Sequence, residues 1–465
     1  MKGSGKVSAQ ASTMDKNYSQ MLSGSIPRMI SKLAVPSMIS MMITSIYNAA
    51  DTYFVSTLGT SASAAVGVVL PIMTIIQAFG FTFGMGANSN ISRLLGRKDY
   101  RKANAIASSA LASCMLFCLA FVILAFLIMQ PMLTFFGATS SILPYAESYA
   151  SLILLGGPLI GGAFVLNNLL RSQGLNAMSM IGLAIGGFLN IVLDPIFIFV
   201  FDMGIAGAAL ATVISQTVSF LVLFYIIQKK SVLNLQFQRI SKRLSTYIEI
   251  VKIGLPSFFR QAMASMAIIL LNNQAAVYGD AAVAAFAILG RINQIFYAFV
   301  IGFGQGFQPV AGYNYGGGKY KRVRQAYYFT FVAMLVILII AAIIMFSFSE
   351  EMIRFFRDDP KVVAIGAKSL KYFAIAFVTQ PALTASNMML QSTGQARSAT
   401  FTAMLRQGLY FLPLIFLLPH LWQLEGLMLV QPVADVLSAL TTLPFALVFL
   451  NRLKKMEAHQ VEHLT

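Results

Sequence analysis

The sequence predicts an all-α integral membrane protein, with twelve transmembrane helices in two parallel-repeat six-helix lobes around a central cavity. Composition gives the first reason, because 57% of the 465 residues are hydrophobic and only 11% are charged. In soluble domains about 45–50% of residues are apolar and about 25% are charged. The second reason is a set of apolar runs long enough to span a bilayer, which takes about 20 helical residues. The third is an internal repeat at an offset of 220 residues.

Long uncharged runs such as residues 329–346 indicate helices, because a β-barrel would show short alternating strands. The expected spans are residues 29–56, 60–90, 104–129, 143–169, 177–201, 204–227, 248–277, 283–311, 323–348, 364–391, 397–418 and 424–451.

The longest polar connection, residues 228–247, divides these spans six and six. The predicted organisation is a polar N-terminal tail (1–24), an N-lobe (25–230), a cytoplasmic linker (231–247), a C-lobe (248–452) and a C-terminal tail (453–465).

Lysine and arginine placement predicts the orientation. With the N-terminus inside, 25 of the 33 basic residues fall in inside segments and five in outside loops. Basic loops stay on the cytoplasmic side, so both termini are expected there. The same asymmetry explains the net charge of +17 without a nucleic-acid partner. We therefore expect a multi-pass protein of the bacterial cell (inner) membrane.

The internal repeat covers apolar and polar positions alike. Pro36 and Ser37 align with Pro256 and Ser257, and the same offset persists over more than 130 residues. Each half has an even number of spans, so both halves enter the membrane from the same side. Parallel repeats of this kind are a transporter architecture.

Nucleotide-driven pumping by this chain is not expected. The glycine-rich stretch Gly312–Lys319 has the wrong spacing for a phosphate-binding loop, and Tyr320 stands where that loop needs Ser or Thr.

Three aspartates lie within expected spans, namely Asp51, Asp194 and Asp435. A central charged residue costs about 2.5–3.5 kcal/mol on insertion scales, so each needs a partner, a proton or a bound cation. Asp51 and Asp194 are predicted to couple transport to a cation. For Asp435, an additional coupling role stands beside a structural hydrogen bond that fixes the last span.

The segment 190–195, Asn-Ile-Val-Leu-Asp-Pro, concentrates oxygen ligands. Asn190 and Asp194 share one helix face, and Pro195 frees the carbonyl of Ile191. Thr212, in the next span, adds a hydroxyl. These groups suit Na⁺, and the same carboxylate could instead carry a proton.

Other polar or bent positions have simpler interpretations. Pro36 is expected to be a hinge in the first span, or only a packing kink. Arg260 and Arg291 lie within spans and are treated as structural.

The enzyme class that the sequence must be checked against is the intramembrane aspartyl proteases. Pro381, Ala382 and Leu383 spell a tripeptide found in that class, but the sequences around Asp51 and Asp194 lack its other signatures. No enzyme activity is expected.

The chain resembles the MATE (multidrug and toxic compound extrusion) transporters, and within them the MepA-like, DinF-type bacterial branch. The resemblance covers essentially residues 25–455. It rests on the motifs at residues 47–59, 91–96, 189–195 and 207–212 and on the duplicated Pro-Ser pair.

This resemblance implies two six-helix lobes around a central cavity and efflux of cationic or amphiphilic drugs in exchange for H⁺ or Na⁺, with no other cofactor. It also implies an N-lobe cation site at Asp51, Asn190, Asp194 and Thr212. Some relatives carry a glutamate in the seventh span, but residues 258–261 here read Phe-Phe-Arg-Gln. A C-lobe site of that kind is therefore not expected.

Two other functions remain open at this stage. One is a flippase for lipid-linked saccharides in the same superfamily, which twelve spans and in-membrane aspartates disfavour. The other is a non-transporting membrane scaffold, which would not need buried acids on a duplicated frame.

Overall fold

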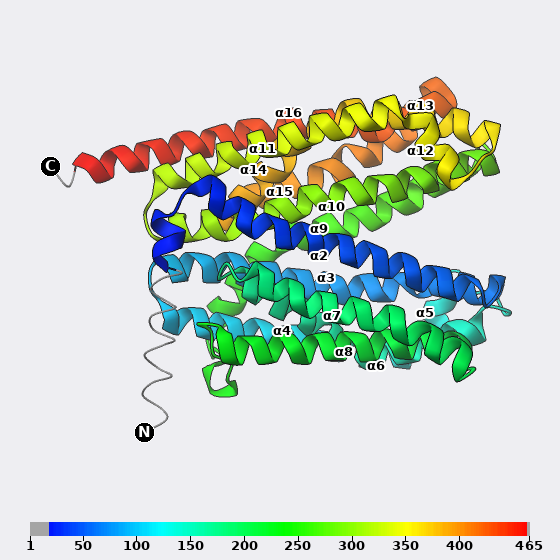
Figure 1. Cartoon of the computed structure of the whole chain (residues 1–465), viewed down its shortest axis with the longest axis horizontal. Helices are drawn as coiled ribbons and strands as arrows, with labels where there is room; N and C mark the ends of the chain where they lie inside the picture. The colour runs from blue at the N-terminus through cyan, green and yellow to red at the C-terminus, as the bar shows by residue number, and fades with distance from the viewer. Residues whose placement is uncertain (1–17, 463–465) are drawn as a thin grey trace. The chain divides into compact units, whose positions relative to one another are not determined.

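The computed structural model describes residues 18–462, and that part of the chain is almost entirely helical and contains no strand (Figure 1). The first half contains α2 (Ile26–Ser56), α3 (Thr60–Gly96), α4 (Tyr100–Leu127), α5 (Met129–Phe135), α6 (Leu143–Arg171), α7 (Asn176–Pro195), the π-helical turn η1 (Ile196–Val200) and α8 (Gly204–Lys230).

The second half begins with a short 3₁₀ turn in the linker. Its elements are η2 (Phe237–Arg239), α9 (Leu244–Ala276), α10 (Asp280–Gly316), α11 (Tyr320–Ser347), α12 (Ser349–Phe356), α13 (Pro360–Phe377), α14 (Gln380–Ser392), α15 (Ala396–Met404), the π-helical turn η3 (Leu405–Leu409) and α16 (Phe411–Glu462).

The number of spans agrees with the predicted architecture. Among the described residues, ten helical stretches are long and apolar enough to cross a membrane, and α13 with α14 forms an eleventh. One of the ten, Ala396–Gln460, contains the non-helical residues Trp422 and Gln423. Counting its two limbs separately gives twelve.

The span expected over 364–391 consists of two helices. The structure bends by 49° between α13 and α14, a feature that the span prediction did not include. Pro381 lies in the first turn of α14 and has no N–H to donate to the carbonyl four residues back. The helix therefore restarts at Gln380 instead of continuing.

The chain divides into two compact units. The first contains the residues up to Met21 and Ile39–Gly254, and the second contains Leu22–Met38 and Leu255–Thr465. Two of the boundaries, after Met38 and after Gly254, fall inside helices α2 and α9, and each lies within two residues of a proline, Pro36 or Pro256.

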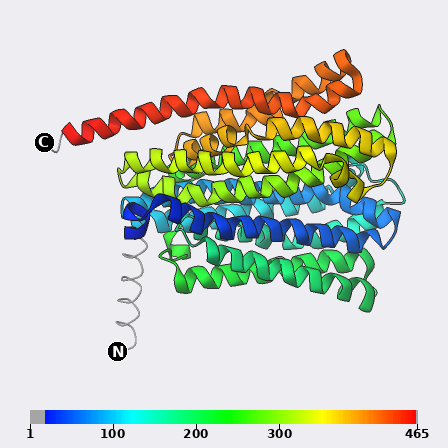
Figure 2. The same ribbon diagram turned by 45° about the horizontal axis from the view of Figure 1, so that its top comes forward.

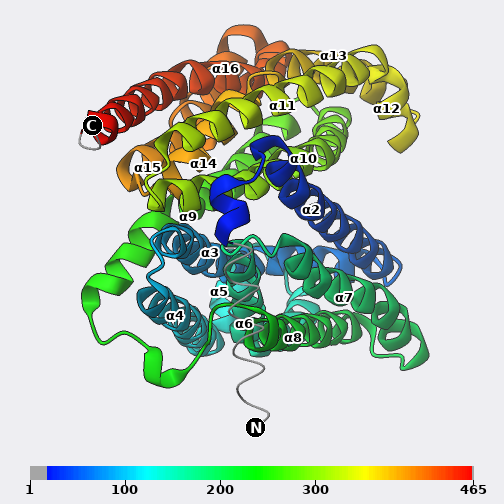
Figure 3. The same ribbon diagram turned by 60° about the vertical axis from the view of Figure 1, so that its left-hand side comes forward.

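Helix α6 is the centre of the first unit. It contacts α3, α4, α7 and α8, and Figure 3 shows these helices side by side. Small residues on α6 permit this packing. A Cβ on Gly161 would lie 2.7 Å from Sγ of Cys118, and one on Gly162 would lie 2.7 Å from the Phe220 ring.

The first turns of α9 cross α3 in the same unit with the two backbones in contact. A Cβ on Gly254 would lie 1.9 Å from the carbonyl oxygen of Thr82. One on Gly86 would lie 2.0 Å from the carbonyl oxygen of Ile250. No larger residue fits this crossing without moving a helix.

The second unit packs around α10, which contacts α11, α13 and α14, while α16 covers α13 and α14 (Figure 2, yellow to red). Its core includes Phe377, Ile292 and Met345, all almost fully buried. Both units thus follow the small-residue and apolar packing expected of helices in a bilayer.

Candidate functional site in the first unit

Asn190 and Asp194 lie one turn apart on α7, as their spacing predicts. The side-chain amide of Asn190 donates to Oδ1 of Asp194 at 3.1 Å. Asp194 is 0% exposed and Asn190 is 3% exposed. The sequence segment therefore presents a buried carboxylate held in place by its own helix.

Thr212 joins this pair from α8. The amide nitrogen of Asn190 lies 3.4 Å from Oγ1 of Thr212. The two helices approach closely because α7 carries glycines where they meet, and a Cβ on Gly186 would lie 3.0 Å from Cβ of Ser219. Asn190 thus connects the carboxylate on one helix with the hydroxyl on the other.

Asp51 reaches the same region from α2. Its carboxylate is close enough to Asp194 for the two to interact electrostatically. Tyr47, one turn before Asp51, packs against Gly187 of α7. The structure therefore brings all four predicted residues to one site.

The oxygens at this site are not satisfied by the protein. Oδ1 of Asp51, Oδ1 of Asn190 and Oδ2 of Asp194 are buried and have no hydrogen-bond partner among the described residues. Buried polar atoms are normally paired, and leaving one unpaired costs about 1–3 kcal/mol. A proton or a cation would supply what these oxygens lack.

Tyr149 is a member of the site that the sequence did not reveal. It lies on α6, is 0% exposed, and interacts electrostatically with both Asp51 and Asp194. Its hydroxyl has no partner in the described structure. A tyrosine in an apolar span carries no distinguishing pattern, so only the packing of α6 could identify it.

The backbone changes form directly after α7, which ends at Pro195. Residues Ile196–Val200 form the π-helical turn η1, closed by the Phe201 N–H donating to the carbonyl of Ile196. Pro195 cannot donate a backbone hydrogen bond, which loosens the helix at this point. The loosened backbone therefore lies immediately beyond Asp194.

Asp435 has a different environment, in the second unit. Nε of Arg406 lies 2.7 Å from its Oδ1, and Gln380 and Gln431 donate to its two oxygens at 2.9 Å and 2.6 Å. The guanidinium also lies over the Tyr297 ring, 4.9 Å from its centre. This neutralised, fully hydrogen-bonded carboxylate favours the structural interpretation over an additional coupling role.

The remaining predicted residues lie outside the cluster. Pro36 is inside the continuous helix α2, next to the boundary at Met38. Arg260 donates to Oγ of Ser257 at 3.3 Å, and Arg291 is exposed.

The ligand set is not that of a transition metal. In residues 18–462 no three His, Cys, Asp or Glu side chains come together to hold a metal. The site instead combines two carboxylates with amide and hydroxyl oxygens, which are ligands for hard cations.

Sequence comparison finds the repeat and names the family. The MatE family profile matches twice, over residues 36–196 and 256–417, which confirms the 220-residue repeat. The multidrug export protein MepA of Staphylococcus saprophyticus is 29% identical over 431 residues, covering 92% of this chain and 95% of that protein. MepA of Staphylococcus aureus is 29% identical over 422 residues, covering 90% and 93%.

Comparison with solved structures points to the same family. A multidrug resistance MATE family transporter of the MOP superfamily in an outward-facing conformation is 26% identical, with a TM-score of 0.89, over 94% of this chain and 98% of that chain. A MATE crystal structure in the bent conformation is 25% identical, with a TM-score of 0.89, over 95% and 99%. The chain therefore belongs to the MatE family, the multidrug and toxic compound extrusion transporters.

Proposed function

We propose that this transporter is a cation-coupled multidrug antiporter, which exports cationic or amphiphilic drugs by alternating access in exchange for H⁺ or Na⁺. The relatives are described as multidrug export proteins. The observation that carries the coupling is the set of buried, unpartnered oxygens on Asp51, Asn190 and Asp194.

The cluster can bind and release a small cation. Two neighbouring carboxylates repel each other, and a proton or Na⁺ between them removes that repulsion. The amide of Asn190 fixes one oxygen of Asp194 and leaves the other for the ion. The bound cation would be transported cargo and not a resident cofactor.

Alternating access requires a helix that can change shape. Pro36 lies inside α2, and Asp51 lies on the same helix beyond the boundary at Met38. In this proposal, cation binding at Asp51 changes how readily α2 bends at Pro36. The proposed orientation places both termini in the cytoplasm, which the distribution of basic residues supports.

The test is transport by the purified chain in liposomes under one gradient at a time. Ethidium movement is followed under a pH gradient and then under a Na⁺ gradient, with Asp194→Asn beside the unsubstituted chain. Flux that needs one gradient and is absent in the variant would support the proposal and name the ion.

Asp202→Asn is the matched control. Asp202 is exposed in the turn after η1 with a φ of 52°, a backbone conformation that Asn also adopts. If the unsubstituted chain moves ethidium at the same rate with and without either gradient, that result would contradict antiport. A lipid-translocation assay would then decide whether the chain is a flippase.

A further inference from the structure

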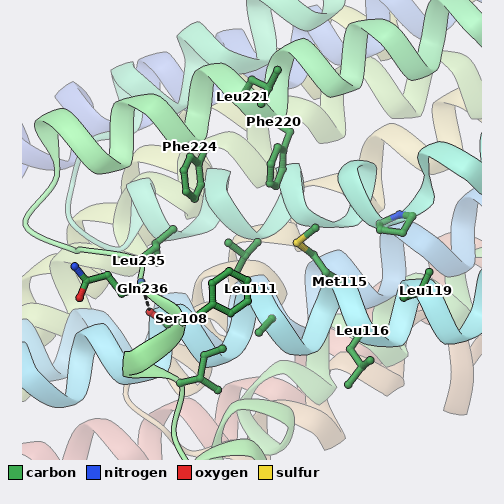
Figure 4. A pocket seen from close by; sticks show the side chains of 14 residues that line it. Ser108, Leu111, Met115, Leu116, Leu119, Phe220, Leu221, Phe224, Leu235 and Gln236 are labelled. Atoms are coloured by element: carbon green, nitrogen blue, oxygen red, sulfur yellow. Dashed lines mark hydrogen bonds between the residues drawn. The ribbon is translucent and has the colours of Figure 1, made fainter.

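An apolar groove in the first unit is lined by none of the residues of the carboxylate cluster. It has a volume of about 620 Å³ and is bounded by α4, α6, α8 and the linker after α8 (Figure 4). Leu111 and Met115 of α4 line one side, and Phe220 and Phe224 of α8 line the other. Its rim is open, since Leu116 is 64% exposed and Leu221 is 57% exposed.

The linker forms one end of this groove and is fixed there. The backbone N–H groups of Asn234, Gln236 and Ser241 donate to side-chain oxygens of Asn104, Ser108 and Ser109 at 2.6, 3.3 and 2.8 Å. These three acceptors lie in the first turns of α4. The linker thus closes the groove toward the basic end of the helix.

A second, polar cavity adjoins the groove at that end. It has a volume of about 490 Å³ and is lined by Arg101, Asn104, Ala105, Gln238 and Arg239. Neither guanidinium has a hydrogen-bonding or ion-pairing partner in residues 18–462. Glu249 instead pairs with Lys102, the residue after Arg101, whose Nζ lies 3.6 Å from its Oε2.

The dimensions match one leaflet of a bilayer. From Ser108 to Leu119, both lining residues, α4 advances about 16 Å at about 1.5 Å per residue. Half of an average hydrocarbon core is about 15 Å. A chain lying in the groove would therefore extend from the polar cavity to about the middle of the membrane.

We propose that this groove and cavity form a binding site for an anionic phospholipid of the cytoplasmic leaflet. One acyl chain lies between α4 and α8, and the phosphate is held by Arg101 and Arg239. Arginine pairs phosphate through two parallel N–H donors, and basic pockets at the cytoplasmic ends of helices are suited to such headgroups. The leaflet follows from the orientation proposed above.

Charge argues against other occupants. A cationic drug would meet two unpaired guanidinium groups, and a second copy of this chain would bring the same two positive charges. Phe237 of the linker is 91% exposed beside the groove, where it would contact the lipid. A phospholipid satisfies the apolar and the basic parts together.

The test is competitive lipid binding to the purified full-length chain in detergent. The protein is offered equal amounts of phosphatidylglycerol and phosphatidylcholine with the same acyl chains, and bound lipids are counted by native mass spectrometry. We expect a several-fold preference for phosphatidylglycerol. R101Q/R239Q should abolish this preference, whereas K242Q/R243Q, which neutralises two exposed linker residues outside the cavity, should retain it.

Separate variants test the role of the apolar groove. Ala112→Trp fills the groove and should reduce retention of both lipids, whereas Ala120→Trp, exposed on the same helix but outside the groove, should not. Excess glycerol 3-phosphate should fail to displace phosphatidylglycerol. Each variant is first shown to elute as a single species with an unchanged melting temperature, and the single variants R101Q and R239Q replace the double variant if it does not.

Equal binding of the two lipids by the unsubstituted chain would overturn the proposal. Equal loss in R101Q/R239Q and K242Q/R243Q would also overturn it, because the attraction would then be a general charge effect. Displacement by glycerol 3-phosphate would assign the cavity to a soluble phosphate compound instead. The ethidium-flux test uses other variants and another measurement, so the two proposals fail separately.

Discussion

The amide nitrogen of Asn190 lies 3.1 Å from Oδ1 of Asp194, one turn along α7, and Oδ2 of the same buried carboxylate has no partner in the described structure. One oxygen is thus held while the other remains available. This division of roles within one carboxylate suits the reversible cation site proposed above, in which Asn190 would position Asp194.

Asn190→Ala should weaken the site without removing its charge. The loss of the amide leaves Oδ1 of Asp194 unpaired, which costs about 1–3 kcal/mol. We expect ethidium flux to need a steeper gradient of the coupling ion, with the drug concentration for half-maximal flux little changed. Flux measured against gradient size checks this. Asn451→Ala, at an exposed position late in α16, is the control, and identical ion dependence in both variants would refute the role of Asn190.

Arg406→Gln should destabilise the second unit. It leaves the buried Asp435 without its ion-pair partner, and breaking a buried pair costs about 3–5 kcal/mol. We expect a clear fall in melting temperature, measured by fluorescence-detected size-exclusion chromatography. The double variant Arg406→Gln with Asp435→Asn should recover much of the lost melting temperature, because no unpaired charge remains. Full stability of the single variant combined with lost ion dependence would instead assign Asp435 to coupling.

Gly254→Ala should disturb the crossing of α3 and α9. The added methyl would lie 1.9 Å from the carbonyl oxygen of Thr82, so a backbone must move, and overpacking of this kind costs about 1–3 kcal/mol. We expect a lower melting temperature and lower yield. Gly290→Ala, where nothing lies within 4 Å of the new methyl, should leave both unchanged. Equal stability of the two variants would show that the crossing is not tight.

Pro36→Ala tests the hinge in α2. Alanine restores a backbone N–H and favours a straight helix, so we expect slower drug flux with an unchanged or higher melting temperature. Pro444→Ala, at an exposed position inside α16, is the control. Wild-type flux from Pro36→Ala would show that this proline only packs.

The sequence predicted most of the fold for simple physical reasons. A bilayer requires long apolar helices, so apolar runs locate the spans and basic residues indicate their ends. The boundary between the last two spans, expected between residues 418 and 424, coincides with the non-helical Trp422 and Gln423. The bend between α13 and α14 escaped prediction because an apolar run looks the same whether it is straight or bent.

The site was predictable only where its residues share a helix. Asn190 and Asp194 are four residues apart, so helix geometry alone predicts their contact. Tyr149 reaches the site from α6, and Arg406 reaches Asp435 across 29 residues of sequence. Those pairings depend on how helices pack against one another, which no local pattern in this sequence records.

Transport by Asp194→Asn under separate gradients tests the central claim most directly. An amide keeps the shape of the side chain but cannot carry the negative charge that the proposed binding of H⁺ or Na⁺ requires. We predict that the unsubstituted chain and Asp202→Asn move ethidium under one gradient, while Asp194→Asn, equally stable and equally reconstituted, moves no more than protein-free liposomes. Normal gradient-driven flux through Asp194→Asn would contradict the account.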